Sequence, residues 1–149
     1  MKLLTKILST FGGLGYSPIA PGTVASFGVI LLYKFWLAAL PWYGFWGIFI
    51  FLFLVGVTTS SRHARELDLE DPRCIVIDEA AGQFLVLHRL APTWPLLIAA
   101  FLLFRLFDIL KPFPIKKVEV FPSGWGIMLD DILAALYAGI VLNIYLFLK

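Results

Sequence analysis

Acidic residues that could bind a metal ion stand at the ends of three apolar stretches: Asp78 and Glu79, then Asp108, then Asp130 and Asp131. Carboxylates at or near the membrane are costly, and they usually serve a function unless they are paired. Five of them in a small bundle would repel one another unless a cation joined them. Mg²⁺ is a hard ion that prefers carboxylate, water and phosphate oxygens. We therefore predict that these five residues bind Mg²⁺.

A simpler interpretation exists for two of these acids. Asp78 and Asp131 could merely stabilise helix starts, because acidic side chains favour the first turn of a helix. That interpretation explains one site as well as metal binding does. Three acidic sites on the same face of a bundle favour the functional interpretation, given the free energy needed to hold unpaired charge there.

Basic residues follow the acids at helical spacing. Arg105 and Asp108 are three residues apart, as are Asp108 and Lys111. This spacing puts each pair on one face of a helix. The pairs could simply close the helix end as ion pairs. Alternatively, Arg105 and Lys111 bind phosphate oxygens, which an arginine can grip with two parallel hydrogen bonds. We favour phosphate binding, because buried ion pairs are weak sources of stability.

Two loops rich in glycine and proline, residues 12–23 and 122–126, precede apolar stretches. Free backbone N–H groups at the start of a helix attract anions. Either Thr23 or Ser26 could cap the helix that follows the first loop. We expect Ser17 and Thr23, together with nearby backbone N–H groups, to help hold a phosphate. The second loop leads directly to the last acidic pair.

The composition indicates that lipid surrounds much of the chain. Of the 149 residues, 60% are hydrophobic and 15% are charged, whereas soluble domains are closer to half apolar and a quarter charged. The net charge of +2 gives no argument for a nucleic-acid partner. The single cysteine, Cys74, excludes an internal disulfide and a multi-cysteine metal site.

Five apolar stretches predict an all-α, polytopic membrane bundle that forms a single domain over residues 1–149. A membrane-spanning helix needs about 20 residues, and the third stretch is interrupted early by its two acids. A short amphipathic helix at the N-terminus is expected to lie on the membrane surface, with Thr5 facing water and Leu3 facing lipid. The five stretches are residues 23–40, 42–60, 74–90, 94–110 and 127–148.

The distribution of basic residues predicts the orientation. If the N-terminus is cytoplasmic, the long polar loops 61–73 and 111–125, which hold six of the 12 lysines and arginines, are also cytoplasmic. The outer side then has two short turns, Arg89 and Lys149. This agrees with the excess of positive charge in cytoplasmic loops of membrane proteins. The same orientation places all ten acidic residues on the cytoplasmic side.

Four strings of the sequence, taken in order, resemble the phosphatidylglycerophosphatase A family. The family often has glycine where Ala25 and Ser123 stand, which affects loop geometry but removes no charged group. The strings are SPIAPGT at residues 17–23, VIDE at 76–79 with Gly82 after it, RLFDILKPFPI at 105–115 and GWGIMLDD at 124–131.

The resemblance implies an Mg²⁺-dependent lipid phosphatase of phospholipid biosynthesis. It would convert phosphatidylglycerophosphate to phosphatidylglycerol and phosphate at the cytoplasmic face of a bacterial inner membrane. The residues alone predict only an anion and metal site at that face. In the expected mechanism Asp78, Glu79, Asp108 and Asp131 are catalytic, and either Asp131 or Glu79 is the general base.

A small ion-coupled transporter is the main alternative, because acids within the membrane also mark ion pathways. A transporter should show internal repeats and a polar route to the outer side. The sequence has no internal repeat, and the predicted outer half contains no acid. The two histidines have no metal-like spacing: His63 is expected in solvent and His88 at the outer interface.

Overall fold

The computed structural model describes residues 2–118 and 120–148, and within these ranges all regular elements are helices. The all-α prediction is therefore confirmed. Glu119 and Lys149, which the predicted topology uses, lie outside the described residues. The elements are α1 Lys2–Ser9, η1 Leu14–Tyr16, α2 Pro21–Leu32, the π-helical η2 Tyr33–Leu37, α3 Trp42–Leu67, α4 Ile77–Val86, α5 Trp94–Leu110, α6 Ile115–Val118 and α7 Gly124–Leu148.

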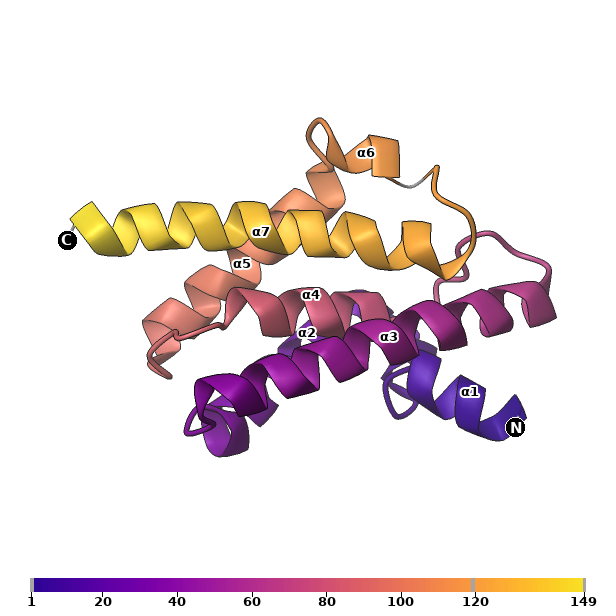
Figure 1. Cartoon of the computed structure of the whole chain (residues 1–149), viewed down its shortest axis with the longest axis horizontal. Coiled ribbons are helices and arrows are strands. Elements are labelled where there is room, and N and C mark those ends of the chain that lie inside the picture. Colours follow the sequence, from indigo (N-terminus) through magenta and orange to yellow (C-terminus); the bar gives the residue numbers. More distant parts are fainter. Residues whose placement is uncertain (1, 119, 149) are drawn as a thin grey trace.

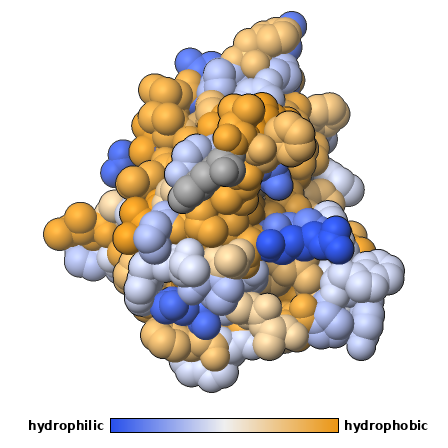
Figure 2. All heavy atoms as spheres, turned by 90° about the vertical axis from the view of Figure 1, so that its left-hand side faces the viewer, coloured by the Kyte–Doolittle hydropathy of each residue, from blue (hydrophilic) through white to orange (hydrophobic). Residues whose placement is uncertain are grey.

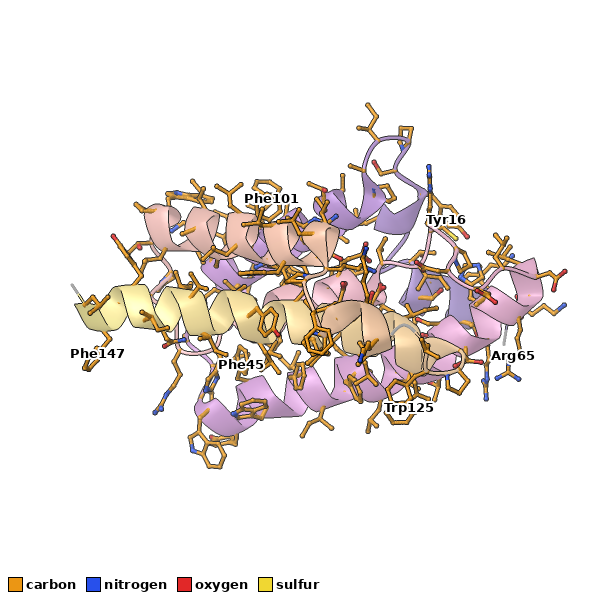
Figure 3. All side chains as sticks on the ribbon, turned by 90° about the horizontal axis from the view of Figure 1, so that it is seen from above. Tyr16, Phe45, Arg65, Phe101, Trp125 and Phe147 are labelled. Atoms are coloured by element: carbon orange, nitrogen blue, oxygen red, sulfur yellow. The ribbon has the colours of Figure 1, made fainter. Side chains whose placement is uncertain are left out.

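The five principal helices alternate in direction along one bundle (Figure 1). The starts of α2, α4 and α7 lie at the same end as the finishes of α3 and α5, and α1 packs against α3 at this end. The polar loop 68–76 joins α3 to α4 there, and α6 and residues 120–123 precede α7 at the same end. In Figure 3 side-chain oxygens are more numerous in the half of the bundle that carries Tyr16 and Arg65 than near Phe147. The expected concentration of polar groups at one end is thus present.

Helix α4 is the centre of the bundle. It contacts α2, α3, α5 and α7, and eight of its ten residues are buried. Ten residues rise about 15 Å, half of the ~30 Å hydrocarbon core of a bilayer. The helix begins at Ile77, before the two acids rather than after them. Its short length leaves Asp78 and Glu79 within the bundle instead of at its outer surface.

Two helices, α3 and α7, are long and apolar enough to cross a membrane. Helices α2 and η2 together make a shorter apolar segment, Pro21–Leu37, and α5 has 17 residues. The prediction of about five membrane helices is therefore confirmed for the helical architecture but not for the number of spans. Viewed from the end opposite the polar loops, apolar residues cover much of the upper part of the surface, and the lower part also carries hydrophilic residues (Figure 2).

Two polar side chains expected in water are buried between α1 and α3. Thr5 is 6% exposed and His63 is 1% exposed, so both expectations were wrong. Ser9 of α1 lies 2.7 Å from Nδ1 of His63, and the two side chains share a hydrogen bond. The apolar residues Leu3 and Leu4 remain exposed, as expected for a surface helix. Sequence reasoning erred because it assigned the polar face of α1 to solvent rather than to α3.

Candidate active site

The site begins with three carboxylates from two helices. Asp78 and Glu79 lie in the first turn of α4, and Asp131 lies about two turns into α7. One oxygen from each carboxylate can be chosen so that all three lie within 4.8 Å of one another. Asp78 is 8% exposed and Asp131 is 2% exposed. Residues 52 positions apart in the sequence therefore meet in one buried cluster.

Close packing of α4 on α7 produces this meeting. A Cβ atom added to Gly82 would lie 2.7 Å from the Phe104 ring and 2.9 Å from the backbone oxygen of Asp131. Real Cβ atoms essentially never approach other atoms so closely. Position 82 therefore requires glycine for the helices to reach this separation.

We expect Gly82→Ala to push α4 and α7 apart and to lower activity by at least tenfold, because small misplacements of catalytic groups cost large factors in rate. The added methyl group should also destabilise the fold by about 1–3 kcal/mol, the usual range for overpacking. Phosphatase assays and thermal melts of the purified variant check both effects. Gly47→Ala is the matched control, because a Cβ there meets nothing within 4 Å. Normal activity of Gly82→Ala would contradict the packing argument.

Two basic side chains contact the remaining acids. Nη1 of Arg105 lies 2.5 Å from Asp108 within α5, and 4.0 Å from Glu79 of α4. Nζ of Lys111 donates a hydrogen bond of 2.6 Å to Asp130 of α7. The predicted neighbourhood of Arg105 and Asp108 on α5 is thus present. The partner of Lys111 on α7 was not anticipated, since the sequence placed it beside Asp108.

The reason lies in the backbone at the end of α5. Lys111 is the C-cap residue and has a positive φ of 42°, so the chain leaves the helical path at this residue. Spacing of three residues predicts a shared face only while both residues are helical. The turn directs the lysine chain towards α7.

The glycine-rich loop forms one wall of a cavity of about 540 Å³ that opens onto the acids. Ser17 lines this cavity, whereas Thr23 is not among its lining residues. A Cβ on Gly22 would collide with the carboxylate of Glu79, so the first turn of α2, which follows the loop, rests directly on the site. All five predicted acids and both predicted basic residues line the cavity: Asp78, Glu79, Asp108, Asp130, Asp131, Arg105 and Lys111.

The start of α2 differs from the expected capping. The N-cap is Ala20, whose φ is 45°, and Pro21 follows it at the first helical position without any side-chain cap. Thr23 and Ser26 both lie inside α2, so neither caps the helix. At the second loop, Ser123 has a positive φ of 58°, a conformation that glycine adopts without strain. The glycine that the family often has at position 123 can therefore form the same turn.

Sequence reasoning missed several residues at the site. Tyr16, Asp71 and Arg73 line the same cavity. Ser61 of α3 accepts a hydrogen bond of 2.9 Å from the backbone N–H of Gly124, which fixes the start of α7. Tyr16 ends η1, and Asp71 and Arg73 come from loop 68–76. The abundance of polar residues in that loop could have indicated Asp71 and Arg73 but not Tyr16.

A second cavity of about 820 Å³ adjoins the first. It lies between the end of α3 and the start of α7, and Arg65 and Ser123 are among its lining residues. Asp71 and Asp130 line both cavities. The acids of the site therefore stand between two polar spaces at the same end of the bundle.

The geometry does not support helix stabilisation as the whole explanation of the acids. Asp131 lies beyond the first turn of α7, where the dipole effect fades. Two unit negative charges 4.8 Å apart repel by roughly 3 kcal/mol at an effective dielectric constant of ~20. Asp78, Glu79 and Asp131 form three such pairs when ionised. A cluster of this kind is suited to a cation and, beside Arg105 and Lys111, to a phosphate group.

Comparisons with known proteins agree with this chemistry. The family model described as phosphatidylglycerophosphatase A matches residues 7–146. A phosphatidylglycerophosphatase A from Haemophilus influenzae is 40% identical over 143 residues, covering 91% of this chain and 84% of that protein. A phosphatidylglycerophosphatase A from Escherichia coli is 34% identical over 141 residues, covering 91% of this chain and 80% of that protein.

Another relative carries a different name. A protein from Bacteroides thetaiotaomicron named "Putative phosphatidylinositol-3-phosphatase" is 35% identical over 155 residues, covering 96% of this chain and 94% of that protein. No solved structure matches the chain. The family match extends over nearly the whole sequence and includes every residue of the acidic cluster. The chain is an enzyme that belongs to the phosphatidylglycerophosphatase A family of phosphatases.

Proposed function

We propose that this chain removes the terminal phosphate of phosphatidylglycerophosphate, giving phosphatidylglycerol and inorganic phosphate. Membership of the family supports the substrate. The observation that carries the chemistry is the cluster of Asp78, Glu79 and Asp131 within 4.8 Å, beside two basic side chains in one cavity. Acids that bind a cation and bases that bind phosphate are the groups that phosphomonoester hydrolysis needs.

Magnesium is the metal that best fits these residues. Mg²⁺ binds oxygen ligands at about 2.1 Å in octahedral geometry, so two ligands of one ion lie at most ~4.2 Å apart. The oxygens of the three carboxylates lie within 4.8 Å of one another, which small side-chain rotations can reduce to that range. Asp78, Glu79 and Asp131 would hold the ion, with Asp108 and Asp130 binding it directly or through water.

The bound ion would supply Lewis acidity and lower the pKa of a bound water. Asp131 or Glu79 accepts the proton from the attacking water as general base. Arg105 stabilises the charge on the phosphoryl oxygens, and its Nε is buried and makes no hydrogen bond to the part of the chain that the structure describes. Lys111 also lines the cavity, where it contacts Asp130, and stabilises charge on the phosphoryl oxygens with Arg105. Ser17, which lines the cavity, helps hold the phosphate at the first loop, whereas Thr23 lies inside α2 and has no such role.

We place this site at the cytoplasmic face of a bacterial inner membrane. The alternating directions of α2, α3, α4, α5 and α7 support five passes through the bilayer, with α4 shielded from lipid by the others. Exposed apolar side chains such as Phe51, Leu102 and Ile140 suit contact with acyl chains. Lys34, in the outer part of the first pass, donates a hydrogen bond of 2.8 Å to the backbone oxygen of Pro92. Its charge is thereby held at the outer end.

We expect phosphate release from phosphatidylglycerophosphate by the purified protein in detergent to fall at least ~100-fold with EDTA, because a catalytic metal supplies several kcal/mol of stabilisation. Excess Mg²⁺ should restore the rate, and EDTA saturated with Mg²⁺ is the control. Phosphatidylinositol 3-phosphate, the lipid in the name of the Bacteroides relative, is the comparison substrate and should react more slowly.

An EDTA-resistant rate would contradict the metal requirement. Faster release from phosphatidylinositol 3-phosphate would contradict the substrate. If neither lipid releases phosphate while the protein conducts ions into vesicles, the transporter alternative replaces the proposal. Labelling of single cysteines introduced at Glu66 and Pro92 in inverted membranes tests the orientation, and reaction at Pro92 instead of Glu66 in those membranes would contradict it.

A further inference from the structure

Two polar side chains lie deeper in the bundle than the acids. Gln83 of α4 and Ser26 of α2 are each 0% exposed. Neither amide atom of Gln83 nor the hydroxyl of Ser26 makes a hydrogen bond to any residue that the structure describes. Buried polar groups are almost always paired, because leaving them unpaired is expensive. The side chains of Gln83 and Ser26 therefore each need a hydrogen-bond partner.

Helix register predicts that Gln83 and Ser26 lie near each other, one turn below Glu79. Gly22 of α2 packs directly on the Glu79 carboxylate, and α2 and α4 contact each other and both run from the acidic end inwards. Moving four residues along each helix leads from Gly22 to Ser26 and from Glu79 to Gln83. In two helices that run the same way, equal steps keep neighbours together. Each step is about 6 Å, one turn below the carboxylate.

Helix geometry predicts that the Gln83 side chain leans towards the site. In an α-helix the Cα–Cβ bonds tilt towards the N-terminus, so a residue covers the turn before its own. The N-terminal neighbour of Gln83 on this face is Glu79, whose Oε2 is also buried and without a hydrogen bond among the described residues. A donor without an acceptor and an acceptor without a donor thus occupy adjacent turns of one helix face.

We infer that Gln83, supported by Ser26, is a positioning residue that holds the Glu79 carboxylate in its metal-binding orientation. The Gln83 amide donates to one buried water, this water donates to Oε2 of Glu79, and Ser26 binds the same water. Oε1, which lies on the side of Arg105, is then left for the ion. The inference rests on the proposed function, in which Glu79 is a metal ligand.

Metal binding without turnover tests this role. Mn²⁺, a spectroscopic substitute for Mg²⁺, is titrated into the purified full-length protein in detergent, and free Mn²⁺ is measured by electron paramagnetic resonance. We expect Gln83→Met, which keeps the length of the side chain, to weaken binding about 10–100-fold, the usual effect of losing a residue that orients a ligand. Ser26→Ala should weaken binding several-fold. Ser60→Ala is the matched control, since Ser60 is another buried hydroxyl without a hydrogen bond to the described residues but lines neither cavity.

A double-mutant cycle separates positioning from general structural damage. If Gln83 acts through Glu79, Gln83→Met should weaken binding no further in a Glu79→Gln background. Equal losses in both backgrounds would overturn the inference. Wild-type Mn²⁺ affinity in Gln83→Met, combined with weak binding in Glu79→Gln, would also overturn the inference. That result would leave the proposed function intact. Wild-type affinity in Glu79→Gln itself would instead refute Glu79 as a ligand and the inference with it. If Gln83→Met does not fold, Ser26→Ala decides the outcome through the same cycle.

Discussion

Replacing Asp131 by asparagine is expected to lower kcat by about 10³-fold or more, since both metal binding and proton transfer use this carboxylate in the proposed mechanism. Asparagine keeps the size of the side chain and removes its charge. Asp131 is 2% exposed and shares the cluster with Asp78 and Glu79. Phosphate release from phosphatidylglycerophosphate at saturating Mg²⁺ measures the effect, and Asp78→Asn should give a loss of similar size.

The stability of the same variant should change in the opposite direction. Without metal, the three carboxylates of the cluster repel one another, so Asp131→Asn should raise the melting temperature of the metal-free protein. A loss of activity caused by misfolding would lower it. Asp68→Asn is the matched control, because Asp68 is exposed and has a φ of 55°, a conformation that asparagine tolerates. Full turnover by Asp131→Asn would remove this residue from the mechanism.

The second large effect is expected at Arg105. Arg105→Gln should lower kcat by about 10²–10³-fold, the usual result of removing a donor that stabilises developing charge. Arg105→Lys should recover only part of the rate, because lysine offers a point charge instead of the planar fork of arginine. The KM for the lipid should change less than kcat if the contact strengthens in the transition state.

Arg105 also compensates the charge of Asp108 at 2.5 Å, so stability must be measured alongside activity. The lysine variant keeps that charge and separates the two roles. Arg62→Gln is the matched control, since Arg62 carries the same charge at the same end of the bundle and is exposed. If Arg105→Gln retains normal kcat while only its melting temperature falls, Arg105 is a structural ion-pair partner and not a phosphate ligand.

Much of the site could be predicted from residue types and their order. The three acidic positions stand at alternate ends of successive apolar stretches, so an alternating path through a bundle must bring them to one end. The structure places Asp78, Asp108 and Asp131 around one cavity, as this reasoning requires. The spacing of Arg105 and Asp108 also predicted their contact, because both residues lie within one regular helix.

The prediction was weaker wherever a contact joined two helices or left a helical path. The partner of Lys111 depends on the turn at the end of α5. The burial of His63 depends on how α1 packs against α3. Gln83 attracted no attention in the sequence, because nothing local distinguishes a buried glutamine beneath a carboxylate from one that faces solvent.

The sequence by itself determined the apolar helical class, the family and the polar residues that converge at one end of the bundle. The helical class and the convergence of polar residues follow from composition and local spacing, which act within a few residues, and the family follows from the resemblance of four ordered strings of the sequence. Only the tertiary structure decided which carboxylates share one cluster, that α4 is buried among the other helices, and which polar groups lie beneath the site. These features depend on the separation between helices. Gly22 and Gly82 set that separation, because a glycine without a Cβ lets its backbone contact side chains from distant parts of the chain.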